Sequence, residues 1–235
     1  MPEIDTPLVV GISTRALFDL REEHQVFEDE GVAAYAELQR GREKIVLPKG
    51  TGFEVVERLL GLNPIGKSPM VEVVLISRNS PDLSLRAFNS VAEYGLNIKH
   101  GSFVSGRPVG PLIKSWSVDL FLSNEESDVR AAAEAGTAAA KLYPPPERAS
   151  AAPSDEVRIA FDGDAVLFDA ESDEIYKARG LEAFLAHERA NLHVPMNRGP
   201  FGHFVRKLAG IRRQVMRADG YPGRLIGIDA IRSLF

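Results

Sequence analysis

Residues 157–169 read VRIAFDGDAVLFD, and this stretch sets the fold class of the chain. It opens with a short apolar run rich in β-forming side chains, which predicts a buried strand of a parallel sheet. Two carboxylates, Asp162 and Asp164, follow with Gly163 between them. Because ligands and catalytic groups collect at the carboxyl ends of strands in open α/β sheets, the pair marks a candidate active turn. A surface Asp-Gly turn that ends an ordinary strand is the alternative interpretation.

The two carboxylates suit a defined chemistry. Their oxygens lie one residue apart on a tight turn, and such oxygens are the ligands that a hard cation such as Mg²⁺ prefers. One carboxylate can attack a substrate while its neighbour transfers a proton. Asp162 and Asp164 are therefore candidates for a catalytic pair and for the ligands of a Mg²⁺ cofactor, with the surface turn as the alternative.

Apolar runs alternate with helical patterns along the whole chain, which indicates an α/β fold with a Rossmann-like, mainly parallel sheet. Strands are expected at residues 8–12, 71–76, 98–104, 118–122 and 157–161. Helices are expected at residues 22–42, 53–62, 85–94 and 128–142. In the first helix, the side chains of Val26, Phe27, Val32, Tyr35 and Leu38 share one apolar face. A Pro-, Ala- and Ser-rich stretch at 144–156 predicts a linker between residues 1–143 and 157–235.

Composition narrows the class of protein. Of the 235 residues, 44% are hydrophobic and 26% charged, which is ordinary for a globular protein. The net charge of −5 argues against binding to a nucleic acid polymer, which needs a basic face. The sequence has no apolar run long enough for a membrane span, no signal peptide at its start and no cysteine, so we expect a cytoplasmic protein without a membrane partner.

An internal repeat is visible when the second half is shifted by 149 residues. The shift superimposes glycines and apolar residues of the two halves, for example Gly180 on Gly31 and Gly199 on Gly50. In the same register, Ser13 matches Asp162 and Arg15 matches Asp164. The fold is therefore predicted to be internally duplicated, with helical cap insertions after the first strand of each copy and a degenerate active turn in the first copy.

An apolar strand followed by Asp-x-Asp-x-Val resembles the first motif of the haloacid dehalogenase-like phosphohydrolases. The string IAFDGDAVLFD, together with GLEAF downstream and VGISTRALFDL and VVLISRNSP upstream, resembles the cytosolic 5′-nucleotidase type I family over most of residues 7–212. This resemblance implies that Asp162 is a nucleophile that forms an aspartyl-phosphate and that Asp164 acts first as an acid and then as a base. It also implies that Mg²⁺ bridges the active turn and the phosphate.

The reaction implied by the resemblance is hydrolysis of nucleoside 5′-monophosphates, such as AMP or IMP, to nucleoside and phosphate. Two other functions stay open: a non-catalytic nucleotide-binding or assembly protein, and a related phosphatase for another phosphomonoester. Turnover of AMP or IMP with Mg²⁺ distinguishes the first from the second, and a panel of substrates distinguishes it from the third.

The second copy is expected to be incomplete, which departs from the family pattern. Features of residues 71–142 should recur near 220–291, and residues 220–235 do not resemble a strand that ends in Ser or Thr. The phosphate-binding Ser or Thr, the Lys and the acidic metal ligands of this half are therefore expected to be missing. Because the strand at 157–161 would then lack its neighbours, we expect self-association into a homo-oligomer, or marginal stability.

Four further residues are candidates for substrate binding. Ser77, Arg78 and Asn79 end a predicted strand, where they can contact phosphate or nucleoside; the alternative is a helix cap and turn before Pro81. Lys114 stands where the phosphohydrolase pattern has its Lys, although in the degenerate copy; the alternative is a solvated surface lysine.

Overall fold

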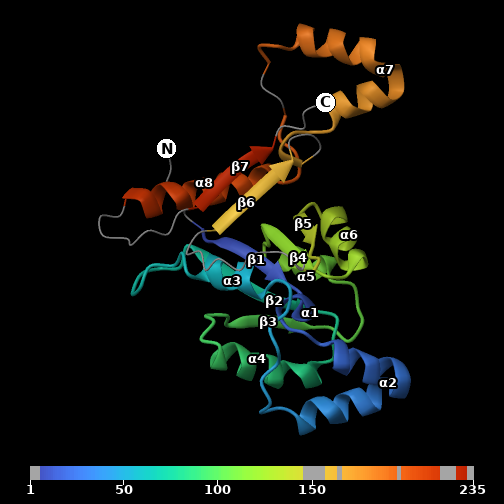
Figure 1. The fold of residues 1–235 in the computed structure, drawn as a ribbon, viewed down its shortest axis with the longest axis vertical. Helices are drawn as coiled ribbons and strands as arrows, with labels where there is room; N and C mark the ends of the chain where they lie inside the picture. The colour runs from blue at the N-terminus through green and yellow to red at the C-terminus, as the bar shows by residue number, and fades with distance from the viewer. Residues whose placement is uncertain (1–5, 145–156, 163–165, 195–196, 218–225, 232–235) are drawn as a thin grey trace. The chain divides into compact units, whose positions relative to one another are not determined.

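The structure is a computed structural model, and it describes residues 6–144, 157–162, 166–194, 197–217 and 226–231. The chain divides into two compact units, Met1–Ser154 and Asp155–Phe235. Each unit is described by itself, with the element labels of Figure 1.

The first unit is built on a five-stranded sheet with the strand order β3-β2-β1-β4-β5. Its strands are β1 (Leu8–Ile12), β2 (Val71–Ser77), β3 (His100–Phe103), β4 (Leu120–Ser123) and β5 (Ala138–Lys141). Every neighbouring pair is parallel, and central β1 pairs with both β2 and β4. The predicted Rossmann-like parallel sheet is therefore confirmed.

Helices cover this sheet because parallel strands are connected by crossovers. They are α1 (Thr14–Leu17), α2 (Arg21–Gly41), α3 (Phe53–Leu60), the 3₁₀ helix η1 (Pro81–Leu83), α4 (Ser84–Glu93), α5 (Gly110–Ser115) and α6 (Glu126–Glu134). The central strands β1, β2 and β4 are mainly apolar and largely buried, as expected for a sheet covered on both faces, while the edge strands β3 and β5 are more exposed. Leu8, Val10 and Ile12 of β1 have no exposed surface. The carboxyl ends of β1 and β2 therefore lead directly into turns and short helices at one edge of a rigid core.

One predicted helix is wrong. Residues 128–142 were expected to form a single Ala-rich helix, but α6 ends at Glu134 and β5 begins at Ala138. The chain reverses at Gly136, whose φ of 84° is available to glycine at little cost. The following segment then pairs with β4, so sheet pairing overrides the helical propensity of its alanines.

Helix α2 also differs from its prediction, because Gly31 has the non-helical angles φ 84° and ψ −174° and divides the helix into two arms. The arms are visible in Figure 1 as two helical segments under the α2 label. The expected apolar face is only partly correct. Tyr35 is buried, but Phe27 and Val32 are 43% and 63% exposed, while the polar Glu23 is buried.

The second unit contains β6 (Val157–Asp162), α7 (Glu171–Ala190), α8 (Gly202–Arg217) and β7 (Ile226–Ile231). Strands β6 and β7 are parallel, in a register that runs from Val157 opposite Ile226 to Asp162 opposite Ile231. The prediction that β6 lacks a neighbouring strand is therefore wrong, although β7 ends at Ile231 rather than at a Ser or Thr. The self-association deduced from that missing neighbour stays a prediction without this support.

Local features recur in the two units near the predicted shift of 149 residues. Gly180 breaks α7 with a φ of 77°, as Gly31 breaks α2. The N–H of Gly50 donates to the carbonyl of Leu17 at 2.9 Å, and the N–H of Gly199 donates to that of Leu167 at 2.9 Å. The glycines keep the shift of 149 residues, whereas the acceptors Leu17 and Leu167 lie 150 residues apart, and the duplication itself stays a prediction.

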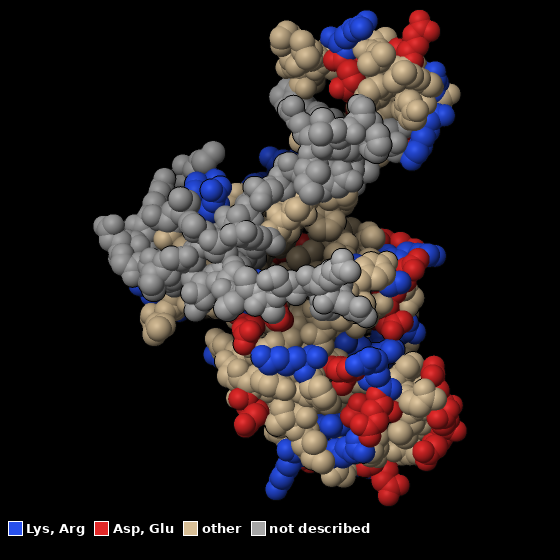
Figure 2. Space-filling model, in the orientation of Figure 1, with Lys and Arg blue, Asp and Glu red and all other residues tan. Residues whose placement is uncertain are grey.

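The visible face of the first unit carries acidic and basic side chains in close alternation (Figure 2). Some pair along a helix, as Arg58 does with Glu54 at 3.3 Å. Among the helices that the structure describes, none combines the length and apolar character needed to cross a membrane. Because the fields of neighbouring opposite charges on this face offset one another, the electrostatic attraction of a small ligand depends mainly on the charges that line individual cavities.

Candidate functional site

A cavity of about 430 Å³ lies in the first unit, at the edge of the sheet where β1, β2 and β4 end. Four segments form its polar side: residues 13–15 after β1, 77–80 at the end of β2, 105–106 after β3, and the segment of Glu125 and Asp128 after β4. Leu20, which precedes α2, and Phe27, Val32 and Tyr35 of α2 form an apolar side. The volume is in the range of pockets that hold small molecules.

Three of the four predicted substrate-binding residues line this cavity, namely Ser77, Arg78 and Asn79. Ser77 is buried at the last position of β2, and its Oγ accepts a hydrogen bond from the N–H of Asn79 at 3.1 Å. The helix-capping role belongs to the neighbouring Ser80, whose side chain accepts from the N–H of Asp82. Lys114 lies exposed on α5, outside the cavity lining.

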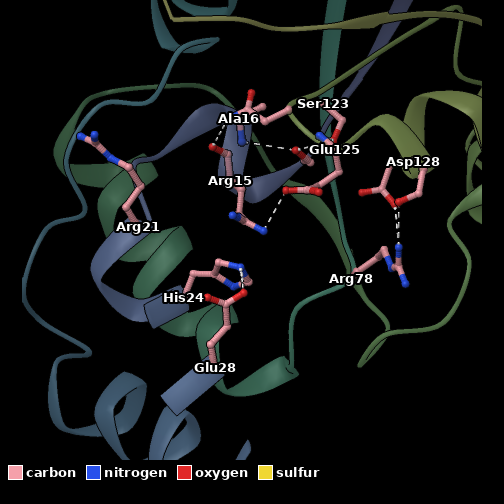
Figure 3. A network of polar contacts seen from close by, with 12 residues as sticks. Arg15, Ala16, Arg21, His24, Glu28, Arg78, Ser123, Glu125 and Asp128 are labelled. Atoms are coloured by element: carbon pink, nitrogen blue, oxygen red, sulfur yellow. Dashed lines mark hydrogen bonds and ion pairs between the residues drawn. The ribbon is translucent and has the colours of Figure 1, made fainter. Parts of the chain in front are cut away.

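Two ion pairs cross the polar side of the cavity (Figure 3). Arg15 Nη1 lies 2.8 Å from Glu125 Oε1, and Arg78 Nη1 lies 3.4 Å from Asp128 Oδ1. Burial raises the pKa of the Asp128 carboxyl, while the charge of Arg78 acts in the opposite direction. Each pair joins turns that follow two different strands, so the sheet fixes where both arginines stand.

Buried hydroxyl groups lie beside these pairs. Ser13 caps α1 by accepting from the N–H of Ala16 at 3.3 Å, and Ser123 Oγ donates to Ser13 Oγ at 3.1 Å. Thr14 has no exposed surface, and its Oγ1 has no hydrogen-bond partner in the part of the chain that the structure describes. A buried hydroxyl of this kind is rare in proteins unless water or a ligand satisfies it.

Aromatic rings form the apolar side. The His24 and Phe27 rings stack with centroids 6.1 Å apart and an interplanar angle of 11°, and Phe27 meets Tyr35 edge to face at 6.1 Å. Burial raises the pKa of Tyr35 to about 12, so its phenol stays neutral. His24 also approaches Glu28, with Nε2 3.2 Å from Oε1 (Figure 3).

The sequence interpretation missed most of this site. It placed Phe27 and Val32 on one apolar face of a helix and assigned no ligand-binding role to Arg15, Glu125 or Asp128. One signal was available, since Arg15 and Glu125 each follow closely after an apolar strand. What was missing was the strand order, which makes β1 and β4 neighbours.

The predicted catalytic pair belongs to the second unit. Asp162 is the last residue of β6 and pairs with Ile231, so its backbone lies at the carboxyl end of a parallel strand. The side chain of Asp162, and Asp164 as a whole, lie outside the described residues. Within the described part of the chain, no group of three or more His, Cys, Asp or Glu side chains could hold a metal ion. The Mg²⁺ site therefore stays a prediction.

The chain matches known proteins over most of its length. The chain is 28% identical over 221 residues to cytosolic 5′-nucleotidase 1B from Homo sapiens. The match covers 91% of this chain and 36% of that protein, so the chain spans about a third of its relative's length. No solved structure matches the chain. A 5′-nucleotidase family model matches residues 1–228, including the residues that follow both β1 and β6 in the sequence, and the chain therefore belongs to the 5′-nucleotidase family.

Proposed function

We propose that this chain acts as a Mg²⁺-dependent 5′-nucleotidase that converts nucleoside 5′-monophosphates, such as AMP or IMP, into nucleoside and phosphate. One observation carries the proposal: the family match spans the Asp162-Gly163-Asp164 sequence, and Asp162 ends a parallel strand. The human relative is named a cytosolic 5′-nucleotidase. We extend that activity and a cytoplasmic location to this chain as part of the proposal.

In this proposal, the Asp162 carboxylate attacks phosphorus, and the bond between phosphorus and the 5′ oxygen breaks. Asp164 gives its proton to the leaving 5′ oxygen, which departs as the nucleoside hydroxyl. Asp164 then accepts a proton from water as that water attacks the aspartyl-phosphate. Phosphate leaves and Asp162 is restored, so one difficult displacement becomes two easier ones.

The chemistry of the two donors fits Mg²⁺, because carboxylate oxygens are its preferred protein ligands. Asp162 and Asp164 would hold it, and its positive charge would offset the repulsion between the carboxylates and the phosphate. The same residues could serve a phosphatase for another phosphomonoester. A substrate panel at fixed Mg²⁺ identifies which phosphomonoester is turned over fastest.

Removing the metal tests the proposal. We expect purified chain to release phosphate from AMP with Mg²⁺, to lose at least about 99% of that rate in excess EDTA, and to recover when Mg²⁺ is added back. The loss follows because the carboxylates and the phosphate would repel one another without a cation. Hydrolysis that persists in EDTA, or a preparation that never hydrolyses any member of the panel, would contradict the proposed mechanism.

A change at the corresponding turn of the first unit should not affect hydrolysis. We expect Ser13→Ala to leave turnover and Mg²⁺ dependence unchanged and to destabilise the first unit by about 1 kcal/mol, because it removes the cap of α1. Thermal melting and phosphate release measure the two effects. Ser115→Ala is the control, since its hydroxyl makes an exposed bond to the carbonyl of Pro111. A tenfold loss of turnover in folded Ser13→Ala protein, about 1.4 kcal/mol, would show that the first unit takes part in the chemistry.

A further inference from the structure

We propose that the cavity of the first unit is a second ligand site, which binds a phosphate monoester bearing a planar ring, such as a nucleoside monophosphate. It would hold this ligand without a metal ion and without hydrolysing it. The inference concerns a different unit from the Asp162 turn and does not depend on the hydrolysis proposed for that turn. Four features of the cavity support it.

The first feature is a pair of arginines at one end. Arg15 follows β1 and Arg78 follows β2, and their side chains are 29% and 45% exposed. A guanidinium has five N–H donors in a planar fork, and Glu125 engages Arg15 through Nη1. Further donors of Arg15 can therefore face a ligand, and forked donors suit the oxygens of a phosphate.

The second feature is a group of uncharged polar side chains in the cavity lining. The Thr14 Oγ1 is buried in the cavity lining without a partner in the described residues, and a ligand oxygen would satisfy it. Ser77 and Asn79 also line this part of the cavity. Both were predicted from the sequence as contacts to phosphate or nucleoside, and we propose that the phosphate they contact is the one bound here.

The third feature is the apolar end on α2. Phe27 and Val32 belong to the pattern of a core face, yet they remain 43% and 63% exposed at the cavity. The His24 ring lies nearly parallel to Phe27 and extends the flat surface. Flat aromatic surface beside phosphate-binding groups suits a ligand that carries a planar ring, because rings stack on one another.

The fourth feature explains why the cavity would bind a phosphate monoester without hydrolysing it. Ser13, rather than a carboxylate, follows β1, and the nearby carboxylates of Glu125 and Asp128 are each engaged by an arginine. The described residues contain no group of three or more His, Cys, Asp or Glu side chains that could hold a metal ion. The N–H donors of Arg15 and Arg78 that these carboxylates leave open would therefore bind the phosphate oxygens, with no Mg²⁺ and no carboxylate nucleophile.

The test uses the full chain with Asp162→Asn and Asp164→Asn, in EDTA, with AMP and inorganic phosphate as calorimetric probes. We expect one equivalent of AMP to bind. Adding Arg78→Gln should weaken binding of both probes by at least roughly tenfold, because a charge-assisted contact is lost. Adding Phe27→Ala should weaken AMP binding several-fold and leave phosphate binding unchanged. The matched control Arg130→Gln changes an arginine on α6 that is 70% exposed and should leave both affinities unchanged.

Absence of AMP binding in EDTA, or an AMP affinity that Arg78→Gln leaves unchanged, would overturn the proposal. An unchanged AMP affinity after Phe27→Ala would overturn the assignment of the ring. Thermal melting identifies any variant that does not fold, and Arg15→Gln then replaces Arg78→Gln as the test of the arginine pair. Failure of the Mg²⁺-dependent hydrolysis assay with the unaltered chain would contradict the proposed function alone, because this binding assay contains neither Mg²⁺ nor turnover.

Discussion

Asp162→Asn is expected to lower Mg²⁺-dependent hydrolysis of AMP at least about a hundredfold, because removing a covalent catalyst normally costs orders of magnitude. An amide is a poor nucleophile, and it is also a weaker ligand for Mg²⁺ than a carboxylate. The fold should be unaffected. Asparagine is nearly isosteric with aspartate, and the pairing of residue 162 with Ile231 is made by the backbone.

The matched control is Asp169→Asn in the same unit. Asp169 Oδ1 accepts a hydrogen bond from the N–H of Glu171 at 3.3 Å, and the asparagine oxygen can accept the same bond. This variant removes one carboxylate without touching the proposed nucleophile, so we expect full turnover. Phosphate release under single-turnover conditions, with circular dichroism melting for both variants, makes the comparison. If Asp162→Asn keeps more than about a tenth of the wild-type rate, the nucleophile is another group.

The sheet of the first unit could be predicted because its strands are encoded locally. Residues 8–12 and 71–76 are apolar runs of strand length, and both appear as strands β1 and β2. β5 and β7 could not be predicted in the same way. The segment of β5 is rich in alanine and that of β7 includes Gly227 and Asp229, so their strand character comes from pairing with β4 and β6.

The candidate site was predictable only where it is local in sequence. Ser77, Arg78 and Asn79 were found because they directly follow an apolar run. The contact between Arg15 and Glu125 joins residues 110 positions apart, and it depends on β1 and β4 being neighbours. The contact between Phe27 and Tyr35 depends on Gly31, since residues eight positions apart on a continuous helix lie about 12 Å apart along its axis.

The break at Gly31 leaves α2 as two arms, and Arg86 of α4 joins them. Its Nη1 donates to Glu23 Oε1 at 2.7 Å and to Gln39 Oε1 at 3.2 Å. Glu23 precedes Gly31 and Gln39 follows it, so one guanidinium contacts both arms. The Arg86 and Glu23 side chains are only 3% and 4% exposed, which makes this a buried ion pair.

We expect Arg86→Met to lower the free energy of unfolding of the first unit by about 3–5 kcal/mol, the usual cost of breaking a buried pair on one side. Methionine fills a similar volume but donates no hydrogen bond, so the Glu23 carboxylate stays buried without its main partner. Arg42 Nη1, at 3.9 Å from Glu23 Oε1, is too distant to replace a bond of 2.7 Å. Urea unfolding followed by Trp116 fluorescence reports on this unit, because Trp116 is the only tryptophan of the chain.

Two further variants distinguish the stability lost by breaking the buried ion pair from the stability lost when the packing contacts of an arginine side chain are removed. Arg58→Met breaks an exposed ion pair with Glu54 and should cost at most about 1 kcal/mol. The double variant Glu23→Leu/Arg86→Met removes both charges and should recover most of the stability that Arg86→Met loses, because no unpaired charge remains. If Arg86→Met costs no more than Arg58→Met, apolar contacts alone position the arms of α2.

If Arg86 does hold the two arms of α2 together, Arg86→Met should also weaken AMP binding in EDTA, because His24, Phe27 and Tyr35 of the cavity wall all lie on those arms.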